Sequence, residues 1–310
     1  MVSLTAPRSP DRKARQRVDD LLSRYRSRTS EMLEPLVGAY HPVMLDGARA
    51  EYRKMLELST KMNLVGHACT EIAGYDYDTR RQTIGTLFGA CCFLADSFID
   101  DFGDEATREY LDRLGQLLTE GWFDVRTDRE RLFYVIVARL FAERDILDPT
   151  IRQAILFLYQ AQKQDVALRL NANGGRSTLG RRQLELLKQC ARNRSGHAII
   201  VLSSFLLPEV PLRHLALIFS AGALIMYIDD HGDCYSDLSH ARATFMNQVR
   251  QPERTLRQIF SSFIQRLSEG LPQNAGRDLL IAFLTRYYLT RVEKHRQQRV
   301  RVGHAWTVYE

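Results

Sequence analysis

Apolar residues recur at intervals of three and four positions along almost the whole chain of 310 residues, with polar residues between them. This spacing is typical of amphipathic helices, whereas the strict alternation of a half-buried strand is scarce. The pattern therefore predicts an all-α fold. We expect a basic, flexible amino-terminal segment over residues 1–30 and one all-α domain over residues 31–310.

Two predicted helices open with a capping box, in which a Thr side chain and a Glu or Gln three residues later satisfy backbone groups at the helix start. Thr79 with Gln82 is one such pair, and Thr127 with Glu130 is the other. The apolar run after Thr79 continues to Asp101 before a glycine interrupts it. One helix is therefore expected to carry several aspartates at its carboxyl end.

Prolines and glycines mark the remaining helices. Asp148 is a good cap residue directly before Pro149, so this pair predicts a helix start. A segment rich in Asn and Gly, residues 171–177, is expected to be a short link between helices. Three further helices are predicted over residues 179–207, 215–230 and 252–269.

The composition is that of an ordinary folded protein, with 45% hydrophobic and 26% charged residues. The longest apolar stretch, residues 215–228, is shorter than the ~20 residues that span a bilayer, and the amino terminus lacks the apolar core of a secretory signal. The five cysteines are odd in number and form no CxxC pair, which argues against a disulfide framework or a zinc site. We therefore expect a cytoplasmic protein with no stable membrane insertion.

The formal charge of +6 suits a polyanionic partner, which could be nucleic acid, an anionic lipid or a diphosphate. Much of the excess lies near the two ends of the chain, in residues 8–28 and 286–301. Charge alone does not choose among these partners. The sequence contains no recognised helix-turn-helix or zinc module, so we expect no nucleic acid partner.

A first acidic cluster ends the helix that begins at Thr79. Asp96, Asp100 and Asp104 are spaced by four residues, so a helix would bring them to one face, with Asp101 beside them. Like charges at this spacing repel each other and destabilise a helix. Either these carboxylates are solvated or a cation compensates them.

A second acidic cluster follows the apolar run over residues 215–228. It contains Asp229, Asp230, Asp233 and Asp237, which again fall at spacings of three, four and seven. Oxygen ligands without companion Cys or His suit Mg²⁺, which binds through one or two carboxylates together with substrate phosphates. We expect more than one Mg²⁺ ion, held by the two clusters at opposite sides of one cavity.

The segment 80–101 resembles the squalene and phytoene synthase pattern of paired arginines, an apolar helix and DxxxD. In that register Asp96 and Asp100 take the metal positions, whereas the overlapping DDxxD register of elongating synthases and terpene cyclases uses Asp100, Asp101 and Asp104. The two registers stay open. Further on, residues 161–165 resemble the GQxxD helix of elongating synthases, residues 194–196 lie where that family has Lys-Thr-Gly, and residues 229–233 match a second DDxxD.

Over about residues 80–237 the chain thus resembles the class I isoprenoid synthase superfamily. The resemblance implies a single-domain helical bundle with a central apolar pocket, Mg²⁺ as cofactor and a prenyl diphosphate as substrate. It implies catalytic roles for Asp100, Asp230 and Arg194. The implied metal ligands are Asp96, Asp100, Asp101, Asp104, Asp229, Asp230, Asp233 and Asp237. The implied substrate-binding residues are Arg80, Arg81, Gln162, Lys188, Arg194, Arg291, Lys294, Phe93 and Tyr227.

Two departures narrow the expected activity. The paired arginines that follow the first acidic cluster in elongating synthases are absent, since Arg108 stands alone, and the Asn/Ser/Glu metal pattern of many cyclases is replaced by aspartates. We expect a class I terpene synthase that ionises a linear prenyl diphosphate and cyclises or rearranges the cation. The alternatives are a head-to-head prenyltransferase of the squalene or phytoene synthase kind and a noncatalytic helical binding protein. Monomer and homodimer both stay open.

The pocket floor is expected one to two turns before each acidic cluster. Gly89 and Ala223 occupy those positions, and small residues there would leave room for an isoprenoid tail. Apolar and aromatic walls would shelter a carbocation from water. His197 and His231 are candidate bases for the final proton loss, although a lone histidine near such a site is usually structural.

Overall fold

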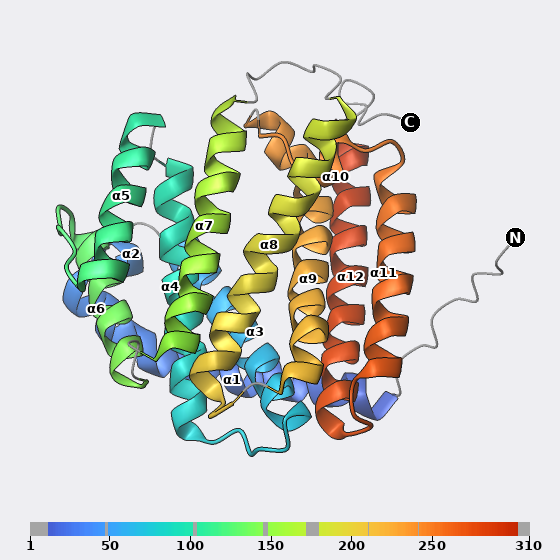
Figure 1. The fold of residues 1–310 in the computed structure, drawn as a ribbon, viewed down its shortest axis with the longest axis horizontal. Helices are drawn as coiled ribbons and strands as arrows, with labels where there is room; N and C mark the ends of the chain where they lie inside the picture. The colour runs from blue at the N-terminus through green and yellow to red at the C-terminus, as the bar shows by residue number, and fades with distance from the viewer. Residues whose placement is uncertain are drawn as a thin grey trace, which may run out of the picture. The chain divides into compact units, whose positions relative to one another are not determined.

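The structure, a computed structural model, describes residues 12–46, 49–101, 104–144, 148–171, 180–209, 211–240 and 242–302. The described part of the protein is all-helical, with 87% of its residues in helices, and this confirms the predicted all-α fold class. Figure 1 shows the helices in chain order. They are α1 (Arg12–Tyr40), α2 (Val43–Asp46), α3 (Arg49–Ile72), α4 (Thr79–Asp101), α5 (Asp104–Glu120), α6 (Asp128–Ala142), α7 (Pro149–Asn171), α8 (Arg181–Leu206), α9 (Leu212–Ser239), α10 (Phe245–Gln248), α11 (Pro252–Gly270) and α12 (Ala275–Val302).

Most predicted helix boundaries are confirmed. The capping box of Thr127 and Glu130 opens α6, with Thr127 Oγ1 accepting from the Glu130 amide at 3.1 Å. Asp148 Oδ1 accepts from the Thr150 amide at 2.8 Å directly before α7, and the pKa of Asp148 falls because of these backbone hydrogen bonds. The predicted link over residues 171–177 falls almost wholly outside the described residues.

The cap of α4 lies one residue earlier than predicted. Asp78 Oδ1 accepts from the amide of Arg81 at 2.8 Å, so Asp78 caps the helix and Thr79 is already inside it. The predicted partner, Gln82, instead accepts through Oε1 from Arg28 of α1 at 2.8 Å. Aspartate and threonine are both good cap residues, and here Asp78, not Thr79, takes the cap position.

The predicted boundary at residue 30 falls inside α1. From Arg12 onward this segment is helical, and Val18, Leu21 and Tyr25 are buried. These apolar side chains recur at helical spacing between arginines that are exposed, except for Arg17, which is partly buried and ion-paired with Glu71. The basic run is therefore one face of a packed helix over its described part.

Contacts divide the chain into two compact units. The first unit comprises residues 16–156 and 201–210, and contains α2 to α6 with most of α1. The second unit comprises residues 1–15, 157–200 and 211–310, and contains α9 to α12 with most of α7 and α8. The predicted single all-α domain over residues 31–310 stays a prediction, and continuous helical periodicity carries no signal of a division into compact units.

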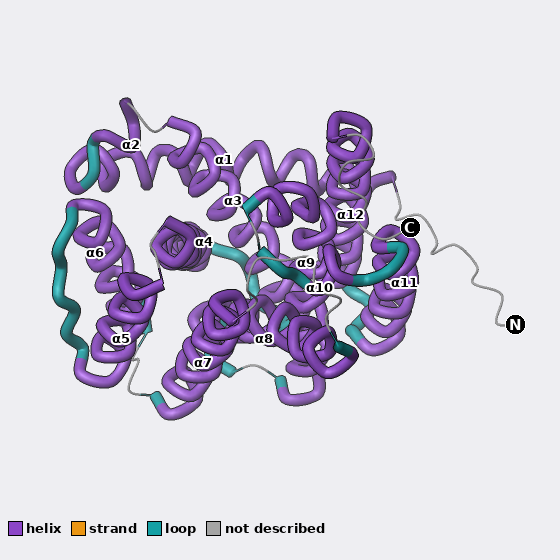
Figure 2. Tube along the Cα trace, turned by 90° about the horizontal axis from the view of Figure 1, so that it is seen from above, coloured by secondary structure: helices purple, strands orange, loops and turns teal. Residues whose placement is uncertain are grey.

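In the first unit α4 packs against α3 and α6. In Figure 2 α4 is seen end on, with α5 and α6 to its left. Phe98 of α4 meets Tyr110 of α5 with ring centroids 4.8 Å apart and Phe133 of α6 at 5.9 Å. These buried aromatic rings form the core between the three helices.

In the second unit α9 packs against α10, α11 and α12, and α9, α11 and α12 run side by side in Figure 1. Helix α8 approaches α9 at two glycines. A Cβ on Gly222 would lie 2.4 Å from the Ser195 carbonyl oxygen, and one on Gly196 would lie 2.5 Å from the Phe219 ring. The absence of a side chain at both positions allows the close crossing.

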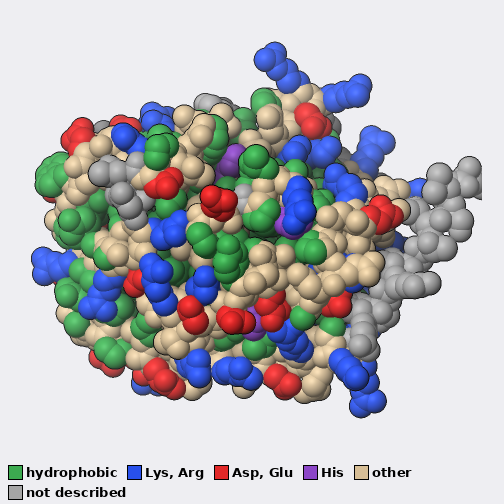
Figure 3. Space-filling view, turned by 60° about the horizontal axis from the view of Figure 1, so that its bottom comes forward, with side chains coloured by type: hydrophobic (Ala, Val, Ile, Leu, Met, Phe, Trp, Pro, Cys, Tyr) green, Lys and Arg blue, Asp and Glu red, His purple; other side chains and the backbone are tan. Residues whose placement is uncertain are grey.

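Two of the described helices are long and apolar enough to cross a membrane by composition, over residues 79–99 of α4 and 212–239 of α9. In the most apolar window, 61% of the first and 44% of the second is buried within the protein. Figure 3 shows Lys and Arg side chains interspersed with Asp and Glu over the face drawn.

Candidate functional site

The first acidic cluster, in the first unit, is split between two helices. Asp96 and Asp100 lie one turn apart on α4, which ends at Asp101. Asp104 opens α5, so the prediction of one helical face carrying all three aspartates is wrong for Asp104. A carboxylate is favourable at a helix start, where the backbone amides lack partners. The side chains of Asp100, Asp101 and Asp104 lie outside the described part of the structure.

Asp96 is the member of this cluster whose side chain is described, and it is partly buried. Its negative charge adds to the effect of burial on Cys91, whose pKa rises to about 12. The same charge contributes to raising the pKa of the buried Tyr110 phenol. The thiol and the phenol near Asp96 therefore stay protonated at neutral pH.

The second acidic cluster, in the second unit, lies within a helix and not at its end. The predicted helix stops at residue 230, whereas α9 continues to Ser239. His231 and Cys234 are fully buried beyond the predicted end, so packing supports the extra turns. The intervening Gly232 allows a close contact, since a Cβ there would lie 2.6 Å from Cδ of Arg291.

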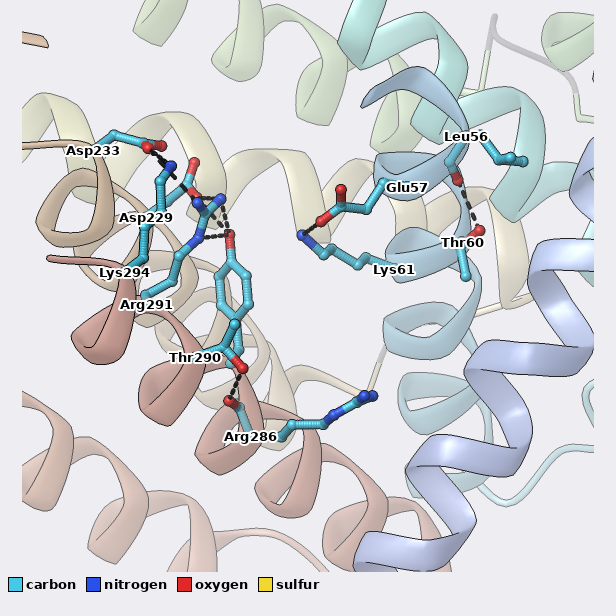
Figure 4. A network of polar contacts seen from close by, with 11 residues as sticks. Leu56, Glu57, Thr60, Lys61, Asp229, Asp233, Arg286, Thr290, Arg291 and Lys294 are labelled. Carbon is cyan, nitrogen blue, oxygen red and sulfur yellow. Dashed lines mark hydrogen bonds and ion pairs between the residues drawn. The ribbon is translucent and has the colours of Figure 1, made fainter. Parts of the chain in front are cut away.

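Asp229 is paired with two side chains of α12. Tyr287 donates its hydroxyl proton to Asp229 Oδ1, and Arg291 forms an ion pair with the same oxygen. Arg291 also donates to the Tyr287 hydroxyl through Nη2 at 3.0 Å. Figure 4 shows Arg291 pointing from α12 toward Asp229. The carboxylate raises the pKa of Arg291 despite its burial, so the guanidinium remains charged.

Asp233, one turn further along α9, is paired with Lys294 of α12. Arg291 Nη1 also lies 3.6 Å from Asp233 Oδ1. Arg291 and Lys294, both predicted to bind substrate, thus meet the second acidic cluster. Protein cations, and not solvent alone, compensate the repulsion between Asp229 and Asp233.

Arg194 of α8 is held by two side chains of the 161–165 segment of α7, those of Gln162 and Asp165. Its Nε donates to Gln162 Oε1 at 3.0 Å, and its Nη1 donates to Asp165 Oδ2 at 2.9 Å. The predicted residues Gln162 and Arg194 are therefore brought together. Asp165, which the sequence indicated only as part of a resemblance, is their third member.

Asp230 has a pKa well above its usual range. Burial disfavours its charged form, and the nearby carboxylates of Asp237 and Asp229 add to the effect. The positive charge of Arg194 opposes the rise, and the more distant Asp165 adds to it. A bound cation would favour the ionised form of this carboxylate.

Lys188 and Tyr227, both predicted to bind substrate, differ in exposure. Tyr227 is only 2% exposed and donates its hydroxyl proton to the Lys188 carbonyl oxygen at 3.1 Å. Its ring packs against Phe245 and Phe263, so it belongs to the core of the second unit in this structure. The Lys188 ammonium is partly exposed, 3.7 Å from a Glu185 oxygen.

Arg80 and Arg81, the other predicted arginines, lie in the first unit and make structural contacts. Arg80 is ion-paired with Glu143 at 2.9 Å and is largely exposed. Arg81 donates to the carbonyl oxygen of Leu206 at 3.0 Å and to Asp78 at 3.0 Å. It therefore caps the carboxyl end of α8. Phe93, also predicted to bind substrate, is partly buried on α4.

The predicted pocket floor at Gly89 is wrong. A Cβ on Gly89 would lie 2.4 Å from Cα of Ser59, so this glycine is the point at which α3 and α4 cross. The backbone of α3 at Ser59 occupies the space predicted for the substrate beside Gly89. Ala223 is fully buried in α9.

The two candidate bases are enclosed by aromatic rings. His231 is fully buried against His295, with ring centroids 4.1 Å apart, and burial lowers its pKa to about 3. Neither ring nitrogen of His231 has a hydrogen-bond partner within the described residues. His197 stacks on Phe157 at 5.4 Å and meets Phe219 edge-on at 5.0 Å. Both histidines are neutral in these surroundings.

Within the described part of the chain, no three Asp, Glu, His or Cys side chains form a preassembled metal site. The donor atoms at the second cluster are carboxylate oxygens, which are hard ligands. Their chemistry therefore fits Mg²⁺ better than a softer metal.

None of the protein families, curated proteins or solved structures compared with this chain matches it. Assignment of a function therefore rests on the chemistry of the residues themselves.

Proposed function

We propose that the protein is a Mg²⁺-dependent class I terpene synthase that ionises a linear prenyl diphosphate and cyclises or rearranges the resulting cation. The observation that carries the proposal is the arrangement in the second unit. Asp229 and Asp233 of α9 form ion pairs with basic side chains of α12. The positive charge of Arg194 of α8 acts to lower the pKa of Asp230, also on α9. Acidic and basic groups in one place suit a metal–diphosphate complex, which needs partners of both signs.

The residues that would hold Mg²⁺ at this site are Asp229, Asp230 and Asp233, with Asp237 one turn beyond. When bound, the ions neutralise charge on the diphosphate and so make it a better leaving group. In the first unit we assign the same role to Asp96 and Asp100, with Asp101 and Asp104 as the alternative register.

Arg194 would bind the diphosphate. Gln162 and Asp165 fix the guanidinium at 3.0 and 2.9 Å, so its orientation is set before the substrate arrives. A side chain held in advance loses little entropy when it binds an anion. Lys188 lies six positions earlier on α8 and is partly exposed, so it would contact the outer oxygens.

A noncatalytic helical binding protein is the second candidate. One observation favours it, since Arg291 and Lys294 already compensate Asp229 and Asp233 without any metal ion. Such pairs also occur in purely structural helix packing. The two candidates differ in whether purified protein consumes a prenyl diphosphate.

The test is incubation of purified protein with Mg²⁺ and single prenyl diphosphates of two to five isoprene units, followed by mass spectrometry of the extract. A hydrocarbon or alcohol made from one substrate molecule supports the proposal. A product of doubled chain length indicates a prenyltransferase of the squalene or phytoene synthase kind. Unchanged substrate at every chain length supports the binding protein.

Two variants link any product to the site. Asp230→Asn removes the charge of a carboxylate at the centre of the second cluster and should abolish product formation. Glu293→Gln is the matched control, because Glu293 is exposed on α12 and accepts a hydrogen bond from Gln297 on the same helix. This variant should retain full turnover.

A further inference from the structure

Four charged side chains form ion pairs between α9 and α12, and the Tyr287 hydroxyl contacts one of these pairs. Asp229 is paired with Arg291 and Asp233 is paired with Lys294, and Arg291 lies between the two carboxylates. The side chain of Arg291 runs over Gly232, where a Cβ would lie 2.6 Å from its Cδ. We name these four residues the α9–α12 ion-pair set.

The α9–α12 ion-pair set is electrically balanced, with two negative and two positive groups. A metal cation approaching Asp233 meets the Lys294 ammonium, and an anion approaching Lys294 meets the Asp233 carboxylate. Mg²⁺ alone or an anion alone must therefore break the Asp233–Lys294 ion pair. When both bind, each ligand gives a new partner to the side chain that the other displaces. The Lys294 side chain is 38% exposed and that of Asp233 is 28% exposed, so water and ligands reach this pair.

We propose that Lys294 and Arg291 are exchangeable counter-cations, which rest on Asp233 and Asp229 and transfer to the diphosphate when Mg²⁺ takes over the carboxylates. The inference depends on the proposed function for the identity of the two ligands. Each group that loses a partner in the exchange gains another of opposite charge, since both carboxylates gain Mg²⁺ and both cations gain phosphate oxygens.

The exchange makes the two ligands cooperative. Mg²⁺ releases the basic side chains for the diphosphate, and the diphosphate removes those side chains from the carboxylates. Such coupling is reciprocal, so each ligand raises the affinity for the other by the same factor. The resting pairs would also keep the site from accumulating Mg²⁺ before the substrate is present.

Lys294→Met tests the exchange, because it removes one counter-cation and keeps the length of the aliphatic chain. We expect Mg²⁺ alone to bind this variant about fivefold or more tightly than the wild type, since Asp233 is released. Inorganic diphosphate alone, titrated in EDTA, should bind about fivefold or more weakly, since its cation is lost. Isothermal titration calorimetry measures both affinities.

Opposite shifts in one variant separate exchange from simpler roles. A lysine that only contacts the diphosphate would leave Mg²⁺ binding unchanged, and a lysine that only supports the fold would weaken both. Lys294→Arg restores the charge and should return both affinities toward the wild-type values. Arg296→Met is the matched control. Arg296 also forms an ion pair between helices, at 2.6 Å, but its partner is Glu253, which is not part of the α9–α12 ion-pair set.

Mg²⁺ binding to Lys294→Met that is no tighter than to the wild type overturns the exchange. Failure of the proposed function looks different. If the opposite shifts occur and no prenyl diphosphate is consumed, the exchange stands and the synthase activity is wrong. If turnover occurs without the shifts, the activity stands and the exchange is wrong. Circular dichroism of each variant confirms that the comparison is made between folded proteins.

Discussion

Arg194 of α8 and Asp165 of α7 form an ion pair at 2.9 Å in which each side chain is only 12% exposed. The enclosure of both side chains determines how much the ion pair matters for stability. An exposed ion pair contributes little to stability, whereas removing one partner of an enclosed pair leaves a charge that water solvates poorly. Arg194 is therefore tied to the fold as well as to the proposed diphosphate site.

We predict that Arg194→Ala both destabilises the protein and weakens its binding of diphosphate. Loss of the guanidinium leaves Asp165 enclosed without it, which should lower the free energy of unfolding by about 3 kcal/mol. Urea denaturation measures this change, and calorimetric titration of inorganic diphosphate with Mg²⁺ measures the binding. Arg24→Ala, in the exposed basic face of α1, is the control and should alter neither quantity. Equal behaviour of the two variants would remove Arg194 from the site.

A second prediction concerns Gly89, which the structure moves from the pocket to the crossing of α3 and α4. Gly89→Ala places a Cβ against the Ser59 backbone and should cost about 1 to 3 kcal/mol of stability. Gly38→Ala is the control, because Gly38 is exposed in α1 and a Cβ there meets Leu45 at an ordinary 3.7 Å. That substitution should be neutral or stabilise the helix by up to about 1 kcal/mol. Thermal melting distinguishes the two, and equal melting temperatures would contradict the close approach.

A third prediction concerns the loop between α5 and α6. Glu130 is 1% exposed, pairs with Arg113 at 2.6 Å and accepts from the Arg126 amide at 2.7 Å. Glu130→Gln leaves the enclosed guanidinium without a counter-charge, so we expect a loss of about 3 kcal/mol. Glu109→Gln breaks an exposed pair with Arg126 and should cost less than about 1 kcal/mol. A smaller loss in Glu130→Gln than in Glu109→Gln, measured by urea denaturation, would refute this reasoning.

A fourth prediction concerns pH. The pKa of Asp230 in the folded protein is raised well above its ordinary value of 3.8, so the folded state binds its proton more tightly than the unfolded state. The contribution of Asp230 to stability is therefore fully present below about pH 4 and is lost as the pH rises through the folded pKa. Asp230→Asn removes this dependence. We expect the variant to gain stability relative to the wild type between acidic and neutral pH, measured by urea denaturation in EDTA. A difference that is constant with pH would show that Asp230 is not desolvated.

The boundaries of α4, α6, α7 and α11 were predictable because local signals fix them. A cap residue at the start of α4, α6 and α7 satisfies backbone amides regardless of what packs nearby, and Pro252 marks the start of α11. The length of α9 was not predictable in the same way. Gly232 suggests an interruption in the sequence, but in the fold it lets Arg291 cross the helix closely. A glycine that ends a helix and a glycine that admits a neighbour look alike in sequence.

The candidate site shows the same limit. The spacing of Tyr287, Arg291 and Lys294 puts them on one face of α12, and all three contact aspartates of α9. Arg291 and Asp229 are 62 positions apart in sequence. Their ion pair depends on how α9 and α12 pack, which no local pattern encodes. The role of Asp165 was missed for the same reason, since only the tertiary fold brings α7 against α8 at Arg194.

The most direct test of the proposed activity is the Mg²⁺-dependent release of inorganic diphosphate from prenyl diphosphates of two to five isoprene units. The account predicts release by the wild type that EDTA abolishes and that Asp230→Asn lowers by at least about a hundredfold while the variant stays folded. Release by the wild type at the protein-free rate for every substrate, or equal release by Asp230→Asn, would contradict it.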